Sequence, residues 1–165
     1  MCWVALDRAC RLATHLRPSN RVRSWGKARD EIAAAIMEHG WDDEAGAFTG
    51  AFGSHHLDAA VLLMPLVGFL PASDPRFRRA METVQRELVD DGLSLRWTGA
   101  EEGAFVICSY WLAECLALAG EVDRARKVFD RVGVRANDVG LLSEQVDTAS
   151  GRLLSKFPQT FSMQA

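Results

Sequence analysis

The sequence predicts an all-α protein made of stacked αα-hairpins, with an inner and an outer layer of helices. Apolar residues recur at helical spacing in about six to seven segments. These segments alternate along the chain between helices that are apolar nearly all round and helices with a single apolar stripe. A helix that is apolar all round must be covered on both sides, whereas a striped helix faces water on one side. The alternation therefore predicts two layers.

The expected inner helices span residues 3–16, 57–67 and 105–119. In residues 3–16 apolar side chains cover most of the circumference. The other two segments each carry a single charge, which is Asp58 at the start of one and Glu114 in the other. A helix with so little polar surface is expected to be buried.

The expected outer helices span residues 27–39, 75–89 and 122–132. In residues 75–89, Phe77, Met81 and Val84 share one face, while arginines and a glutamate occupy the other. The remaining two segments show the same stripe. Strand-like alternation is confined to residues 93–97 and 141–154, where at most small hairpins are expected.

The connections between these helices are asymmetric. Inner helices lead to outer helices through short links at 68–74 and 120–121, whereas outer helices lead to inner ones through long loops at 40–56, 90–104 and 133–159. Loops of that length in a compact domain are usually functional. Because successive hairpins alternate in direction, the long loops meet at one end, beside the N-termini of the inner helices. We therefore predict a bowl-shaped site there, where unpaired N–H groups and a positive dipole end are available.

The long loops mix aromatic residues with carboxylates, arginines and amides, which suits a polyhydroxylated ligand but equally suits an ordinary polar surface. The adjacent His55 and His56 do not indicate a metal site, since neighbouring positions rarely direct two side chains at one ion. No metal ligand set and no cofactor are expected. The chain has no G-x-S-x-G, P-loop or G-x-G-x-x-G motif, so acyl transfer and nucleotide chemistry have no support.

Composition restricts the class of protein further. The 165 residues are 48% hydrophobic and 25% charged, with a formal net charge of -3, as in an average globular protein. This mildly acidic balance argues against a nucleic-acid partner, and no apolar run is long enough for a membrane span. With no secretion signal recognised, we expect a cytoplasmic protein. Its cysteines lie in apolar segments and are expected to be buried, reduced thiols.

Several strings along the chain resemble the bacterial branch of glycoside hydrolase family 15, which contains glucoamylases, glucodextranases and some trehalases. They occur in the family's order over essentially the whole sequence. The strings are Met-Cys-Trp-Val-Ala-Leu-Asp-Arg at 1–8, Gly-Phe-Leu-Pro at 68–71, Glu-Gly-Ala-Phe at 102–105, Asn-Asp-Val-Gly-Leu-Leu-Ser-Glu-Gln at 137–145 and Phe-Pro-Gln-Thr-Phe-Ser at 157–162.

The resemblance implies an (α/α)6 barrel, or toroid, with its site at the N-termini of the inner helices. It also implies inverting hydrolysis of α-glucosidic bonds, in which one carboxylic acid protonates the leaving oxygen and a second carboxylate activates water. The second carboxylate, the general base, would be Glu144. Plausible sugar contacts implied by the resemblance are Arg96, Trp97, Glu102 and Asp58. The expected ligand is an α-glucoside or oligosaccharide: a maltooligosaccharide, another glucan or trehalose.

The chain also departs from the family pattern. The family's general acid lies in a Trp-Glu-x-Arg-Gly-like motif that would precede residue 1, and no such motif occurs in the chain. We therefore expect residues 1–165 to form one partial barrel domain whose N-terminal half is absent. Without a positioned acid, worth about 10²–10⁴ in rate, the chain alone should hydrolyse weakly or not at all. Its uncovered inner helices should favour homo-oligomers.

Two further departures concern one loop and the last helix. Residues 96–97 reach Glu102 in fewer positions than the family usually has, which affects the subsite beyond the cleaved bond. The segment at 157–162 opens the next inner helix in the family, whereas the sequence here runs only to Ala165, so we expect only the start of that helix. The residues leave one alternative open, a non-catalytic helical-hairpin module that binds carbohydrate or protein.

Overall fold

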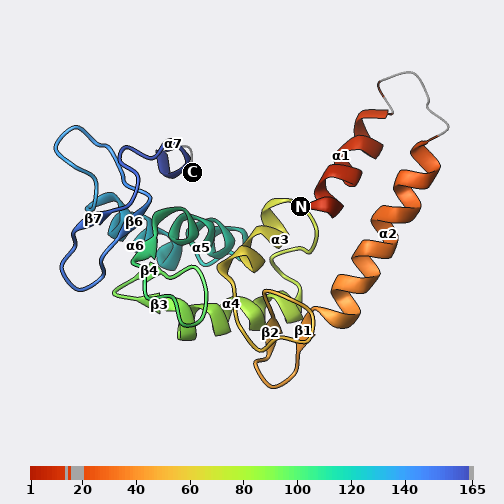
Figure 1. Cartoon of the computed structure of the whole chain (residues 1–165), viewed down its shortest axis with the longest axis horizontal. Coiled ribbons are helices and arrows are strands. Elements are labelled where there is room, and N and C mark those ends of the chain that lie inside the picture. The colour runs from red at the N-terminus through yellow and green to blue at the C-terminus, as the bar shows by residue number, and fades with distance from the viewer. Residues whose placement is uncertain (14, 16–20, 164–165) are drawn as a thin grey trace. The chain divides into compact units, whose positions relative to one another are not determined.

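The computed structural model describes residues 1–13, 15 and 21–163 and is predominantly helical (Figure 1). The all-α prediction is confirmed. The helical elements, in chain order, are α1 (Cys2–Ala13), α2 (Val22–His39), the 3-10 helix η1 (Ala59–Leu62), α3 (Leu63–Leu66), α4 (Pro75–Leu88), α5 (Val106–Leu118), α6 (Val122–Gly133) and α7 (Thr160–Met163).

Within the described residues, short strands form three small sheets in the long connections. The predicted hairpins at 93–97 and 141–154 are present in part, whereas the first pair of strands and the strand before α5 were not expected. The strands are β1 (Trp41–Asp42), β2 (Ala47–Phe48), β3 (Val89–Asp90), β4 (Leu93–Ser94), β5 (Ala104–Phe105), β6 (Gln145–Val146) and β7 (Leu153–Leu154), ordered β1-β2, β3-β4 and β5-β6-β7.

The chain divides into two compact units, residues 1–41 and 42–165, and each is described by itself. In the first unit α1 packs on α2. Within α1, Asp7 is the buried residue, and its carboxylate accepts ion pairs from Arg8, from Arg11 at 2.9 Å and from Arg29 at 3.8 Å.

The sequence predicted that residues 3–16 form an inner helix covered on both sides. The helix ends at Ala13 instead, and its apolar side chains are half-buried or exposed. Residues 14 and 16 of the predicted segment lie outside the described residues. A helix hairpin buries only the facing stripe of each helix, which is the physical reason for the difference. Cys2 is accordingly exposed and Cys10 half-buried, whereas Cys108 and Cys115 are buried as expected.

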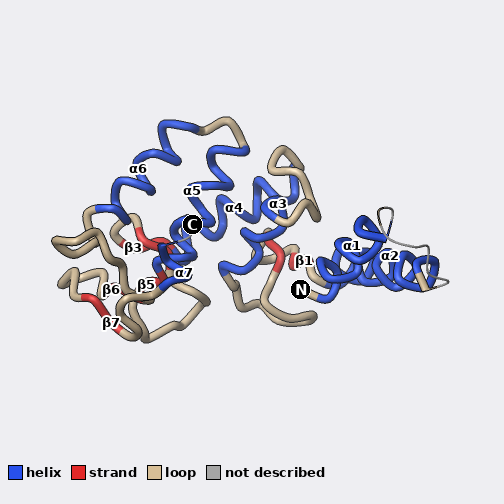
Figure 2. Tube along the Cα trace, turned by 90° about the horizontal axis from the view of Figure 1, so that it is seen from above, coloured by secondary structure: helices blue, strands red, loops and turns tan. Residues whose placement is uncertain are grey.

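In the second unit the layered arrangement is as predicted. The inner helix α5 packs against α6 on one side and against η1 and α3 on another. Figure 2 shows α5 and α6 running side by side. Helix α5 buries a wide arc of its surface, although the side that carries Glu114 and Leu118 is exposed, whereas α4 and α6 bury a narrower stripe. The buried residues of α5 are Val106, Cys108, Ser109, Tyr110, Leu112, Ala113, Cys115 and Leu116.

Local chemistry sets where these helices start. The Asp74 carboxylate caps α4 by accepting hydrogen bonds from the N–H groups of Arg76 at 2.9 Å and Phe77 at 3.2 Å, and Pro75 occupies the first turn.

The predicted helix 57–67 is instead divided into η1 and α3. Pro65 lies in the first turn of α3 and has no N–H to donate to the Val61 carbonyl in η1, so the α-helical hydrogen bond that would join the two segments at that point cannot form. Among the described residues, no helix combines the length and apolar character needed to cross a membrane.

Candidate active site

The second and third long loops meet where α5 and α7 begin, and the end of the first reaches them through the pair of Asp58 with Arg96. A cavity of about 270 Å³ lies there. Arg96 of the loop after β4 and Glu144 of the loop before β6 both line this cavity, so two of the predicted site residues share it. The cavity is lined by Arg96, Phe105, Ile107, Trp111, Glu144, Gln159, Phe161 and Ser162.

Two backbone hydrogen bonds, one through its N–H and one through its carbonyl, fix the position of Glu144. Its N–H donates to the carbonyl of Lys156 at 2.9 Å, and its own carbonyl accepts from the N–H of Val106 at 3.1 Å. The Ser155 hydroxyl donates to Oε2 of Glu144 at 2.7 Å. The half-buried Glu144 carboxylate is therefore anchored beside the first residue of α5.

Asp58 and Arg96 form a linked pair. Arg96 Nε lies 3.0 Å from Asp58 Oδ1, and the same oxygen accepts a hydrogen bond from the N–H of Ala60 at 2.7 Å, which caps η1. The backbone joins them too, because the N–H of Ala59 donates to the Arg96 carbonyl at 2.8 Å. Asp58 thus orients the Arg96 guanidinium at the cavity wall.

Two further groups surround the Arg96 guanidinium. Its central carbon lies 5.7 Å from the centroid of the Trp111 ring, a cation–π distance. The Cys108 thiol lies on the buried side of α5, and burial raises its pKa to about 12 even though Arg96 opposes that shift. Cys108 is consequently protonated at neutral pH and serves as a neutral neighbour of the guanidinium.

Trp97 and Glu102 contact the site from its edge. The Trp97 side chain is 41% exposed, and its ring lies 6.2 Å from that of Phe105, which lines the cavity. Glu102 is exposed, and its Oε2 accepts a hydrogen bond from the Gln145 side chain at 2.7 Å. The structure therefore places Glu102 against Gln145, the residue next to Glu144.

Sequence reasoning missed several residues of the site. Trp111 follows Ile107 by one helical turn on the predicted inner helix, so helical spacing could have indicated it. Gln159 and Phe161 lie in one of the strings that carried the family resemblance. Ser155 had no signal in the sequence, because its approach to Glu144 depends on the pairing of β6 with β7.

The first long loop carries a histidine–carboxylate pair outside this cavity. His55 Nδ1 lies 2.5 Å from Asp42 Oδ2, and a hydrogen bond from the Ala45 N–H is the main reason that the pKa of Asp42 is lowered. Over the part of the chain that the structure describes, no group of three or more His, Cys, Asp or Glu side chains could hold a metal.

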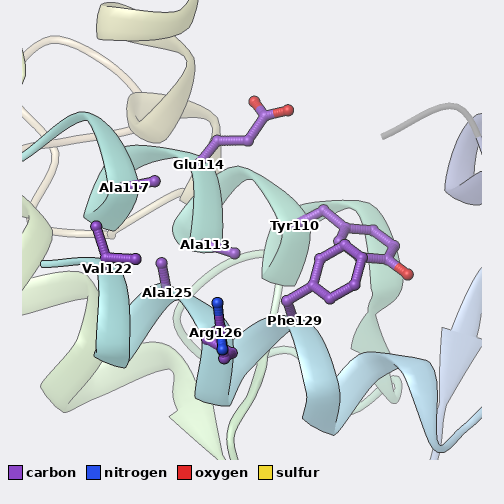
Figure 3. Close-up of a pocket in the computed structure, with 8 residues that line it drawn as sticks. All are labelled: Tyr110, Ala113, Glu114, Ala117, Val122, Ala125, Arg126 and Phe129. Carbon is purple, nitrogen blue, oxygen red and sulfur yellow. The ribbon is translucent and has the colours of Figure 1, made fainter.

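A second hollow, of about 350 Å³, lies between α5 and α6 (Figure 3). Its walls are mostly apolar: the rings of Tyr110 and Phe129 pack 5.5 Å apart, and three alanines and Val122 form most of the remaining surface. The Glu114 carboxylate at its rim is directed away from α6 in Figure 3. This groove lacks the converging polar groups of the Glu144 cavity, so the Glu144 cavity is the better candidate for sugar chemistry.

The fold is that of the helical-barrel glycosidases. A glycosidase solved in complex with glucose superimposes with a TM-score of 0.79 at 22% identity, covering 87% of this chain and 39% of that one. Another glycosidase, solved as the wild type, gives a TM-score of 0.74 at 23% identity over 79% of this chain and 36% of that one. At such identities the likeness establishes the architecture.

The sequence establishes the family. The family described as Glycosyl hydrolases family 15 matches residues 1–165. A trehalase of Mycobacterium tuberculosis is 42% identical over 170 residues, covering 98% of this chain and 25% of the relative. A trehalase of Thermoplasma volcanium is 34% identical over 168 residues, covering 98% of this chain and 27% of that protein. The chain belongs to glycosyl hydrolase family 15 and spans about a quarter of the length of these curated relatives.

Proposed function

We propose that this chain supplies the general base, Glu144, and part of the sugar-binding surface of an inverting α-glucosidase. The single observation that carries the proposal is the shared cavity of Glu144 and Arg96 at the N-termini of the inner helices. A carboxylate and a fixed guanidinium beside aromatic rings provide the groups that a sugar ring and its hydroxyls require. In this proposal residues 1–165 are one part of a larger (α/α)6-barrel domain.

In the proposed reaction, water attacks the anomeric carbon while the Glu144 carboxylate takes the proton from that water. The bond from the anomeric carbon to the leaving oxygen breaks, and a separate carboxylic acid protonates that oxygen. Arg96, oriented by Asp58, donates hydrogen bonds to sugar hydroxyls, and Trp97 extends the aromatic surface at the edge. Glu102 contributes by holding Gln145 beside the base.

For the substrate we propose an α-glucoside, with trehalose as the first to test because the similar curated proteins are trehalases. The free cysteines of the chain fit a reducing compartment, which is the cytoplasm in our proposal. We also propose that copies of the chain associate through exposed apolar side chains of the inner helices, such as Leu12 of α1 and Leu118 of α5.

A chimeric enzyme tests the proposed role of Glu144. The segment of the M. tuberculosis trehalase that aligns with this chain is replaced by residues 1–165, and glucose release from trehalose and from maltotriose is measured. We expect the chimera to be active on trehalose. We expect Glu144→Gln to lower kcat by about 10²–10⁴, because the proton of the attacking water then has no acceptor.

The matched control is Glu114→Gln, which removes the same charge from the rim of the α5–α6 groove and should leave kcat unchanged. Full activity of the Glu144→Gln chimera would remove Glu144 as the base. Calorimetry of the 165-residue chain with trehalose and maltose distinguishes the proposed enzyme segment from a non-catalytic binding module. Sugar binding by the chain, together with a chimera that binds sugar but never hydrolyses it, would favour a non-catalytic binding module.

A further inference from the structure

Arg135, just after the end of α6, contacts the turns of two hairpins that lead to the candidate active site. The chain reaches Arg96 after the β3–β4 hairpin, and Glu144 immediately precedes the β6–β7 hairpin. We propose that Arg135 is a positioning residue that fixes the β6–β7 hairpin, and with it the general base, relative to the loop of Arg96. This inference rests on the proposed function, because it assigns Arg135 a task in the same reaction.

The turn of the β3–β4 hairpin is bound to the end of α6. Asp91 and Gly92 form this two-residue turn, and their φ values are +48° and +76°. A type I′ turn requires a positive φ at both positions, and the Asp-Gly sequence suits it. The Asp91 carboxylate accepts hydrogen bonds from the Arg131 side chain and from Arg135 Nη2 at 2.9 Å. Arg131 Nε also donates to the Asp91 carbonyl at 2.9 Å, so two guanidinium groups hold the turn.

The Arg135 guanidinium also packs on the turn of the β6–β7 hairpin. A Cβ on Gly151 would clash with Nη1 of Arg135, so a residue without a side chain leaves the room that the guanidinium needs. The hydroxyl of Thr148, in the same turn, donates to the Asp90 carboxylate. Arg135 therefore joins two turns that are also linked directly, by Thr148 and Asp90.

Burial distinguishes Arg135 from an ordinary surface arginine. Its side chain is 17% exposed, whereas that of Asp91 is 41% exposed. Isolated exposed ion pairs contribute little, but pairs within a network contribute more. The Arg135 Nε is buried without a hydrogen-bond partner among the described residues, which costs free energy. In this orientation the two Nη groups reach Asp91 and Gly151 together, which explains why the cost is tolerated.

The elements that Arg135 connects also share an apolar cluster. This cluster includes Leu93 of β4, Val132 of α6 and Val146 of β6. Apolar contacts hold elements together without fixing their direction, because the hydrophobic effect is non-directional. Hydrogen bonds from a planar guanidinium do have a fixed direction. We therefore assign the attraction between these elements to the cluster and their mutual orientation to Arg135.

The hairpin transmits the position of its turn to Glu144. Strand β6 has two residues and pairs with β5 on one side and β7 on the other. So short a hairpin has little stability of its own. The Glu144 N–H donates to the Lys156 carbonyl at 2.9 Å, so the base follows the hairpin. If the turn were released from Arg135, the hairpin would pivot about β5, and a shift of about 1 Å at a reacting group can cost about 10²-fold in rate.

The trehalase chimera tests whether Arg135 acts on the reaction. Arg135→Met removes the charge and keeps an unbranched side chain, and it should lower kcat about tenfold with KM little changed, because Arg96 stays in place. Arg135→Lys keeps a charge opposite Asp91 and should recover part of the loss. Arg126→Met, at an exposed position of α6, is the matched control and should leave kcat unchanged.

A second background separates positioning of the base from loss of stability. In the Glu144→Gln chimera, Arg135→Met should lower the residual kcat less than twofold, because no base is left to position. A purely structural role would lower kcat by the same factor in both backgrounds. That result, or an active chimera in which Arg135→Met leaves kcat unchanged, would overturn the inference and leave the proposed function standing. An inactive chimera, or one indifferent to Glu144→Gln, would overturn the proposed function, and the role of Arg135 would fall with it.

Hydrogen exchange in the 165-residue chain tests the anchoring without activity. The N–H groups of Asp147 and Gly151 donate within the β6–β7 turn, to the carbonyls of Arg152 and Asp147. In Arg135→Met both amides should exchange about tenfold faster, while the amides in the middle of α5 keep their rates. Unchanged exchange at both turn amides would overturn the inference, because Arg135 would then not hold the turn.

Discussion

Helices α1 and α5 are both apolar over most of their circumference, yet they have different surroundings. Helix α5, in the unit formed by residues 42–165, buries eight residues over a wide arc of its surface, although Glu114 and Leu118 are exposed. Helix α1, in the unit formed by residues 1–41, has Asp7 as its buried residue, and apolar side chains such as Leu12 are exposed. The difference shows that a helix with an apolar circumference is buried on several faces only where other elements pack against those faces.

The partners account for the two outcomes. Helix α5 is packed by α6 and by η1 and α3, so it has neighbours on more than one face. Helix α1 packs on α2, which covers a single stripe. An ion-pair cluster around Asp7 adds a polar contribution to that hairpin, with Arg11 and Arg29 from the two helices. We therefore expect side-chain truncations to be costly in the larger unit and inexpensive in the hairpin.

The largest expected effect is a truncation in the larger unit. Phe77 of α4 is fully buried, so Phe77→Ala should lower the free energy of unfolding by about 3–5 kcal/mol, from lost burial and the cavity left behind. Leu12→Ala in α1, where the side chain is 58% exposed, should change it by less than about 0.5 kcal/mol. Urea denaturation followed by circular dichroism measures both. Equal losses of unfolding free energy in the two variants would contradict this difference in side-chain burial.

A pair of glycines sharpens the comparison with effects of opposite sign. A Cβ on Gly103 would lie 2.5 Å from the carbonyl oxygen of Val146, so Gly103→Ala should push β5 away from β6 and cost about 1–3 kcal/mol. A Cβ on Gly26 in α2 would have no neighbouring atom within 4 Å, and Gly26→Ala should stabilise the hairpin by about 1 kcal/mol through helix propensity. Thermal unfolding of both variants measures the difference. A stabilising Gly103→Ala would contradict the close approach of the two strands.

A smaller effect than that of Phe77→Ala or Gly103→Ala is expected from the charges of the hairpin. Asp7→Asn removes the charge that Arg8, Arg11 and Arg29 share, and should lower hairpin stability by about 1–2 kcal/mol. Asp30→Asn, which breaks an exposed pair with Arg29, should cost less than about 0.5 kcal/mol. Hydrogen exchange of the α1 and α2 amides, at low and high salt, measures both. If Asp30→Asn proves the more damaging, burial of Asp7 is not what stabilises the hairpin.

Much of the fold could be predicted because its determinants are local. The outer helices α4 and α6 begin at the predicted residues and end within one residue of the predicted positions, since periodicity and the Asp74–Pro75 start signal act over a few neighbours. The division of 57–67 between Leu62 and Leu63, shortly before Pro65, was missed, although a proline inside a helical pattern is a local signal. The exposure of α1 was missed because covering a helix depends on elements distant in the sequence.

By itself, the sequence determined the helical layers, the end of the molecule at which the long loops meet, and the family, because apolar spacing and motif strings are properties of neighbouring residues. Only the tertiary structure decided which side chains within that bowl touch. The contact of Glu144 with Ser155 and that of Glu102 with Gln145 depend on the register of β5, β6 and β7. Register is set by turns and ladder hydrogen bonds between distant segments, and one residue of slip would reverse every side chain.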